Sequence, residues 1–140
     1  MKVAAKKKTA TKTARKKSST TKKKKVSLSL LDVIVKSISD KKGENITSID
    51  LTKIPDTATS HFVICDASSG TQVKAIADSV VEQSRITLNE RPWHVEGIQQ
   101  LDWVLIDFVN VVVHVFRRQA REFYQLEDLW NDGIVTRHDD

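Results

Sequence analysis

The residues best suited by type to do chemistry are Ser68 and Ser69, which lie in the short sequence DASSG at positions 66–70. A serine hydrolase holds its nucleophile in a G-x-S-x-G turn, and this segment lacks the first glycine. A phosphate-binding loop ends in Gly-Lys-Ser or Gly-Lys-Thr, whereas Gly70 is followed directly by Thr71. The segment therefore predicts a turn that caps a helix, not a nucleophile or a phosphate site.

Carboxylates and histidines are the other candidates for catalysis. Asp102 and Asp107 are an odd number of residues apart on one predicted strand, so they face opposite sides of the sheet and cannot share a metal ion. The histidines are widely separated and have no cysteine or carboxylate at metal-ligand spacing. They are His61, His94, His114 and His138. We therefore expect no catalytic residue, no metal and no cofactor.

The most β-prone stretch of the chain must position any functional side chains. It predicts two strands, Trp103–Phe108 and Val111–Phe116, rich in β-branched and aromatic residues. An even-numbered turn at Val109-Asn110 would set Trp103 opposite Phe116, Leu105 opposite His114 and Asp107 opposite Val112. These six paired residues form what we call the mixed face. The opposite face of the two strands is wholly apolar and belongs on the core.

Two interpretations of the mixed face stay open. Aromatic side chains beside a few polar anchors are enriched at protein interfaces, so the face could bind a partner. It could equally form a second core layer under a helix, with Asp107 and His114 satisfied by local hydrogen bonds. Residue spacing alone does not choose between them.

The other elements surround this strand pair. Helices are expected from Ser27 or Ser29 to about Asp40, over about Thr71–Ile86, and over Arg117–Tyr124. Further strands are expected at Asn45–Leu51, His61–Cys65 and Arg91–Glu96. Gly43 is expected to stop the first helix, Asp66–Gly70 to form a turn, and Leu126–Trp130 to be an apolar clamp. The order predicts an α/β fold with a mixed sheet of about five strands, two main helices and a short C-terminal helix.

Charge divides the chain into a basic tail and an acidic body. Residues 1–25 hold 12 Lys and Arg and no acid, whereas residues 26–140 hold 11 Lys and Arg against 18 Asp and Glu, a net charge of −7. We expect a disordered Lys-rich tail over residues 1–26, a folded domain over 27–135 and a polar tail over 136–140. In the basic tail, weak and salt-sensitive contacts with RNA are expected from Lys22, Lys23, Lys24 and Lys25.

The single cysteine, Cys65, excludes an internal disulfide and fits a reducing compartment. It lies in an apolar run, which is typical of a small buried hydrophobe. No apolar run approaches the length of a membrane span, and residues 1–25 lack the apolar core of a secretory signal. We therefore expect a cytoplasmic protein.

Several blocks of the body resemble the RsfS family of ribosomal silencing factors, also called the Iojap family. In order, they are QVKAIAD from Gln72, VEG from Val95, WVLID from Trp103, VVVHVF from Val111, REFY from Arg121 and LEDLW from Leu126. Together they span nearly all of Leu31–Trp130. The resemblance implies a nucleotidyltransferase-like fold without the catalytic carboxylates of that fold, and a non-enzymatic role.

The resemblance also implies a partner. Members of this family bind the large ribosomal subunit through its L-fourteen protein, block joining of the small subunit and so repress translation when nutrients are scarce. A homodimer is implied when the protein is free. An acidic body suits a basic ribosomal protein. The residues expected to contact the partner are Trp103, Leu105, Asp107, His114, Phe116, Tyr124, Leu126 and Trp130, although the last two could equally pin the final helix to the sheet.

Two other classes of function stay open: a nucleotidyltransferase-like enzyme, which the missing pair of carboxylates argues against, and a nucleic-acid-binding protein led by the tail. The chain also departs from the family pattern at three places, one of which is Ser60, where Asp often precedes the second strand. Asp66-Ala67 stands where members commonly have Thr-Gly, and Val109-Asn110 stands in place of Gly-Asp. Valine is unfavourable at positive φ, so this turn could be wider and the register altered.

Overall fold

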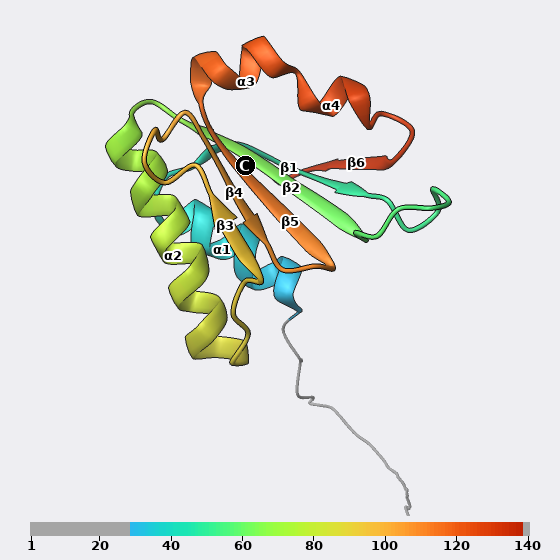
Figure 1. Ribbon diagram of the computed structural model, residues 1–140, viewed down its shortest axis with the longest axis horizontal. Coiled ribbons are helices and arrows are strands. Elements are labelled where there is room, and N and C mark those ends of the chain that lie inside the picture. Colours follow the sequence, from blue (N-terminus) through green and yellow to red (C-terminus); the bar gives the residue numbers. More distant parts are fainter. Residues whose placement is uncertain (1–28, 139–140) are drawn as a thin grey trace, which may run out of the picture.

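The structure, a computed structural model, describes residues 29–138 (Figure 1). The predicted disordered tail, with Lys22–Lys25, lies outside the described residues, and so does Ser27. The elements, in chain order, are α1 (Leu30–Asp40), β1 (Glu44–Asp50), β2 (His61–Ala67), α2 (Gly70–Leu88), β3 (His94–Glu96), β4 (Trp103–Asp107), β5 (Val111–Arg117), α3 (Arg118–Tyr124), α4 (Leu126–Leu129) and β6 (Ile134–Arg137).

A single mixed sheet, in the order β3-β4-β5-β2-β1-β6, separates two layers of helices. Figure 1 shows α1 and α2 on one face and α3 and α4 on the other. The larger core lies beneath α1 and α2. It includes all six side chains of the predicted apolar face: Val104, Ile106, Phe108, Val111, Val113 and Val115. The predicted α/β class is therefore confirmed. Among the described residues, no helix has the length and apolar character needed to cross a membrane.

The first helix begins and ends through local contacts. The Ser29 hydroxyl accepts a hydrogen bond from the backbone N–H of Asp32, and the Asp32 carboxylate accepts one from the N–H of Ser29. This capping box satisfies two N–H groups that the helix leaves unpaired. At the other end, the left-handed residue is Lys42, with φ of 67°, and Gly43 donates its N–H to the carbonyl of Ile38 at 2.9 Å. Glycine is also required at position 43 because a Cβ there would clash with Cγ2 of Ile38.

The predicted register of the β4–β5 pair is confirmed. Trp103 pairs with Phe116, Leu105 with His114 and Asp107 with Val112. On its other side β5 runs parallel to β2, and the long α2 carries the chain away from β2 toward the far edge of the sheet. Ser69 caps α2, since its hydroxyl accepts from the N–H of Gln72.

Two segments that were predicted to lie outside the sheet are partly in strands. Asp66 and Ala67 continue β2 and pair with Phe116 and Arg117, so the predicted turn at Asp66–Gly70 is wrong in its first half. The predicted polar tail at 136–140 is wrong in part as well, because Thr136 and Arg137 belong to β6, which pairs with β1 and adds a sixth strand. Neither segment shows the alternation of apolar and polar residues that predicts a strand. All four residues of β6 are exposed, and Asp66 is a charged residue whose ion-pair partners are distant in sequence.

The hairpin turn keeps its even length at a conformational cost. Val109 has φ of 77°, and the N–H of Asn110 donates to the carbonyl of Phe108 at 3.0 Å, which defines a γ-turn. Valine rarely adopts this conformation. The Asp107 carboxylate offsets part of the strain by accepting the N–H of Val109 at 2.7 Å. Asp107 thus has a structural role in the turn.

Replacing Val109 with glycine should stabilise the protein. Glycine reaches positive φ without a Cβ clash, so Val109→Gly is expected to raise the free energy of unfolding by about 1 kcal/mol, measured by urea denaturation. Asn110→Gly is the matched control, because Asn110 does not have positive φ. A Val109→Gly protein no more stable than wild type would contradict the strained turn.

Candidate partner-binding site

The two strands of the mixed face differ in burial. On β5, the side chains of Val112, His114 and Phe116 are buried. They form what we call the covered half. On β4, Trp103, Leu105 and Asp107 are only partly buried and form the open half. The sheet therefore buries one strand of this face and presents the other to solvent.

Phe116 of the covered half belongs to a second, smaller core beneath α3 and α4. Its buried members are Ile49, Leu51, Ile64, Phe116 and Leu126. Trp130 packs edge-on against Phe62, with ring centroids 5.3 Å apart. Of the residues predicted to bind a partner, His114, Phe116 and Leu126 are thus buried, and they support the surface from below. Leu126 and Trp130 pin α4 to the sheet, which was the second reading of these two residues.

The open half continues onto β3. Pairing of β3 with β4 sets His94 opposite Asp107 and Glu96 opposite Leu105, and residues paired in this way share a face. Nε2 of His94 lies 2.6 Å from a carboxylate oxygen of Glu96. The sequence indicated a strand at Arg91–Glu96 but gave no sign of which strand it joins, so these two residues were missed as site residues.

Trp103 is the most constrained side chain of the open half. Its indole N–H donates to Nδ1 of His114 at 3.1 Å, and its ring packs against Tyr124 at a centroid distance of 4.8 Å. A nitrogen that accepts this bond carries no proton, so His114 is neutral. Burial lowers the pKa of His114 to about 4, and the charge of Asp107 opposes that shift only in part. The indole plane is therefore held in one orientation, with Tyr124 exposed beside it.

Asp107 is one of the residues predicted to contact the partner. One of its oxygens accepts the N–H of Val109, as described above, and within residues 29–138 no cationic side chain forms an ion pair with it. Its negative charge thus stays available at the surface, although the side chain also holds the turn.

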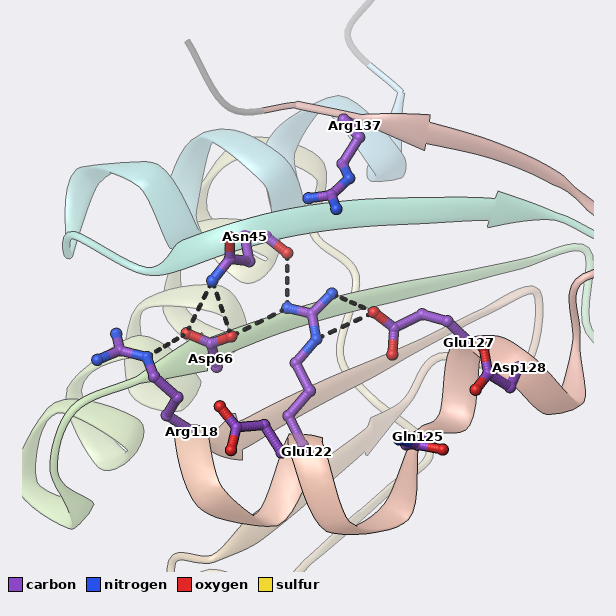
Figure 2. Close-up of a pocket in the computed structure, with 9 residues that line it drawn as sticks. Asn45, Asp66, Arg118, Glu122, Gln125, Glu127, Asp128 and Arg137 are labelled. Carbon is purple, nitrogen blue, oxygen red and sulfur yellow. Dashed lines mark hydrogen bonds and ion pairs between the residues drawn. The ribbon is translucent and has the colours of Figure 1, made fainter.

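Arg121 attaches the α3–α4 layer to the sheet. Figure 2 shows the surrounding cleft, where Asp66 on β2 faces Asn45 and Arg118. The guanidinium of Arg121 donates to Asp66 at 3.3 Å, to the carbonyl of Asn45 at 2.6 Å and to Glu127 at 2.5 Å. Both Arg121 and Asp66 are buried. One arginine thus joins two strands to both C-terminal helices.

This cleft is the polar alternative to the open half as a binding site. It has a volume of about 360 Å³ and is lined by three arginines and four carboxylates, with Asn45 and Gln125. Its two innermost charges, Arg121 and Asp66, are already paired with each other and with neighbours. In the described part of the chain, no cluster of His, Cys, Asp and Glu could hold a metal ion. The ion pairs in this cleft hold α3 and α4 on the sheet.

The sequence profile of the family described as "Ribosomal silencing factor during starvation", RsfS, matches residues 21–140. This chain belongs to the RsfS family. The ribosomal silencing factor RsfS of Halalkalibacterium halodurans is 39% identical over 107 residues, which cover 74% of this chain and 87% of that protein. The RsfS protein of Bacillus subtilis is 37% identical, over 77% of this chain and 90% of its own length.

Solved structures agree with the family assignment. A crystal structure of a protein from Chromobacterium violaceum is similar with a TM-score of 0.69 at 29% identity, covering 73% of this chain and 83% of that chain. The resemblance to RsfS found in the sequence is thereby confirmed, and the fold is that of an RsfS-family protein.

Removing Arg121 should destabilise the protein strongly. Arg121→Met leaves the buried carboxylate of Asp66 without its closest compensating charge, which costs about 3–5 kcal/mol. Arg118→Met is the matched control, because the Arg118 side chain is 42% exposed and its loss should cost less than half as much. Adding Asp66→Asn to Arg121→Met should recover part of the loss. Equal costs for the two arginines, measured by urea denaturation, would contradict the role given to Arg121.

The buried neutral His114 should make stability depend on pH. Its pKa is about 4 in the folded chain against an ordinary value of 6.5, so between these values the unfolded chain binds the extra proton. The stability that neutral His114 contributes is fully present above pH 6.5. It is lost as the pH falls to 4, which lowers the free energy of unfolding by roughly 3 kcal/mol. His114→Gln keeps an acceptor for Trp103 but does not titrate. Its unfolding free energy should fall less than that of wild type over this window; parallel curves would contradict the assignment.

Proposed function

We propose that this protein is a ribosomal silencing factor that binds the large ribosomal subunit at its L-fourteen protein and sterically blocks joining of the small subunit. Translation is thereby repressed when nutrients are limited. The family assignment supports a role at the ribosome, and the relatives named above are called ribosomal silencing factors. The observation that carries the proposal is the open half of the mixed face, an apolar and aromatic surface beside carboxylates.

The physical chemistry of this surface suits a basic protein. Trp103 and Leu105 supply apolar area that a partner can bury. Asp107 and Glu96 supply negative charge beside it, and the body as a whole carries −7 over residues 26–140. Ribosomal proteins are typically basic, so long-range attraction would increase the rate of encounter. No chemical step is needed, because occupation of the docking surface is enough, and we propose that the protein is not an enzyme.

Three further features belong to the same proposal. The protein acts in the cytoplasm, forms a homodimer when free, and uses the Lys-rich tail at residues 1–26 for weak contact with ribosomal RNA. The folded domain, predicted over residues 27–135, is proposed to extend to Arg137, the last residue of β6. The tail would strengthen binding without deciding where the protein docks.

The test is co-sedimentation of the full chain with isolated large subunits, comparing wild type with Leu105→Arg. Leu105 is the best position, because Trp103 and Asp107 also make the hydrogen bonds described above, and their loss would change the fold locally. An added cation on the open half should repel a basic partner and lower the affinity at least tenfold. Ile86→Arg, at a site 58% exposed on α2 across the sheet, is the matched control and should pellet like wild type.

Subunit joining provides the functional readout. Wild type and Ile86→Arg should slow the light-scattering increase when small subunits are added, and Leu105→Arg should not. If Leu105→Arg pellets and inhibits like wild type, the open half is not the docking surface. If instead replacing Lys22–Lys25 with glutamine abolishes pelleting, the tail-led nucleic-acid function is favoured.

A further inference from the structure

Phe123 on α3 is an aromatic side chain that is largely exposed to solvent. It is 81% exposed, although a phenylalanine gains free energy by leaving water. Its ring meets the ring of Tyr124 edge-on, with centroids 5.1 Å apart. Tyr124 is itself 48% exposed and packs on Trp103 of the open half. A continuous row of aromatic rings thus runs from β4 onto the outside of α3.

The exposure of Phe123 follows from how α3 is anchored. Arg121 is buried against Asp66, so its side of α3 faces the sheet. Successive residues of an α-helix turn by about 100°, which directs a side chain two positions later away from the sheet. Phe123 therefore cannot turn inward while Arg121 keeps its ion pairs. Its exposure is a property of the fold and not of a loose side chain.

We propose that Phe123 is the outermost anchor of the partner surface, and that it packs against the aliphatic part of a basic side chain on the bound protein. The inference rests on the proposed function, because it extends the open half rather than defining a separate site. The aromatic row is continuous with Trp103, and Phe123 is flanked on the chain by the exposed Glu122. A lysine or arginine stem over the ring would gain apolar contact and a cation–π attraction, with its charge near carboxylates.

A protein fits this surface better than RNA does. Exposed aromatic rings can also stack on bases, and single-stranded RNA is bound in that way by other proteins. Such sites surround the rings with positive charge to hold the phosphates. Here the open half presents Asp107 and Glu96, and the body carries a net negative charge. Phosphates would be repelled, so the partner that fits this surface is a basic protein.

The test measures the affinity of the full chain for isolated large subunits and for purified L-fourteen protein, with naked ribosomal RNA as a third probe. Phe123→Ala should weaken binding to the first two about tenfold, as expected for an aromatic anchor, with an unchanged melting temperature. Phe123→Leu should recover part of the affinity, because leucine restores apolar area. Ile86→Ala, an exposed apolar residue on α2, is the matched control and should bind like wild type.

Each outcome separates this inference from the proposed function. If Phe123→Ala binds like wild type while Leu105→Arg does not, the function stands and the anchor role of Phe123 is wrong. If both bind like wild type, the proposed docking surface itself fails. If Phe123→Ala loses affinity for naked ribosomal RNA as strongly as for the purified protein, the ring stacks on a base and the inference is overturned.

Discussion

The buried ion pair between Arg121 and Asp66 is the constraint on which the second face of the sheet depends. It joins α3 to β2, while Glu127, bound by the same guanidinium, adds α4. A buried charge without its partner is costly, so the arginine and the carboxylate hold each other in place. Because α3 and α4 are too short to be stable alone, this attachment decides whether they form a layer at all.

With this layer in place, the mixed-face residues of β4 and β5 lie in different environments, which their sequences do not distinguish. On β5, His114 and Phe116 are buried: Phe62 of β2 packs edge-on against His114, and Tyr124 of α3 stacks on Phe116. On β4, Leu105 and Asp107 stay partly exposed. The buried half then shapes the open half: His114 accepts the indole N–H of Trp103, and Phe116 packs beneath the same ring. A surface ordered in this way meets a partner with less loss of side-chain freedom, which favours binding.

The sequence predicted the features that depend on local pattern. Alternation and an even turn predicted the pairs Trp103–Phe116, Leu105–His114 and Asp107–Val112, because a slip of one residue would turn the valines of the core face to solvent. It did not predict which half of the mixed face is covered, since Arg121 and Asp66 are 55 residues apart and their contact leaves no periodic signal. The edge strand β6, exposed on all four residues, likewise lacks the alternation that marks a strand. Residues such as His94 and Glu96 joined the site only through the pairing of β3 with β4.

We propose above that the open half of the mixed face meets the large subunit. The most direct measurement places a photo-crosslinking amino acid at position 105 of the full chain, and in a second protein at position 86 on α2, and irradiates each with isolated large subunits. We expect position 105 to crosslink to the L-fourteen protein and position 86 not to crosslink to it. Crosslinks from position 86 alone, or from position 105 only to ribosomal RNA, would contradict this proposal.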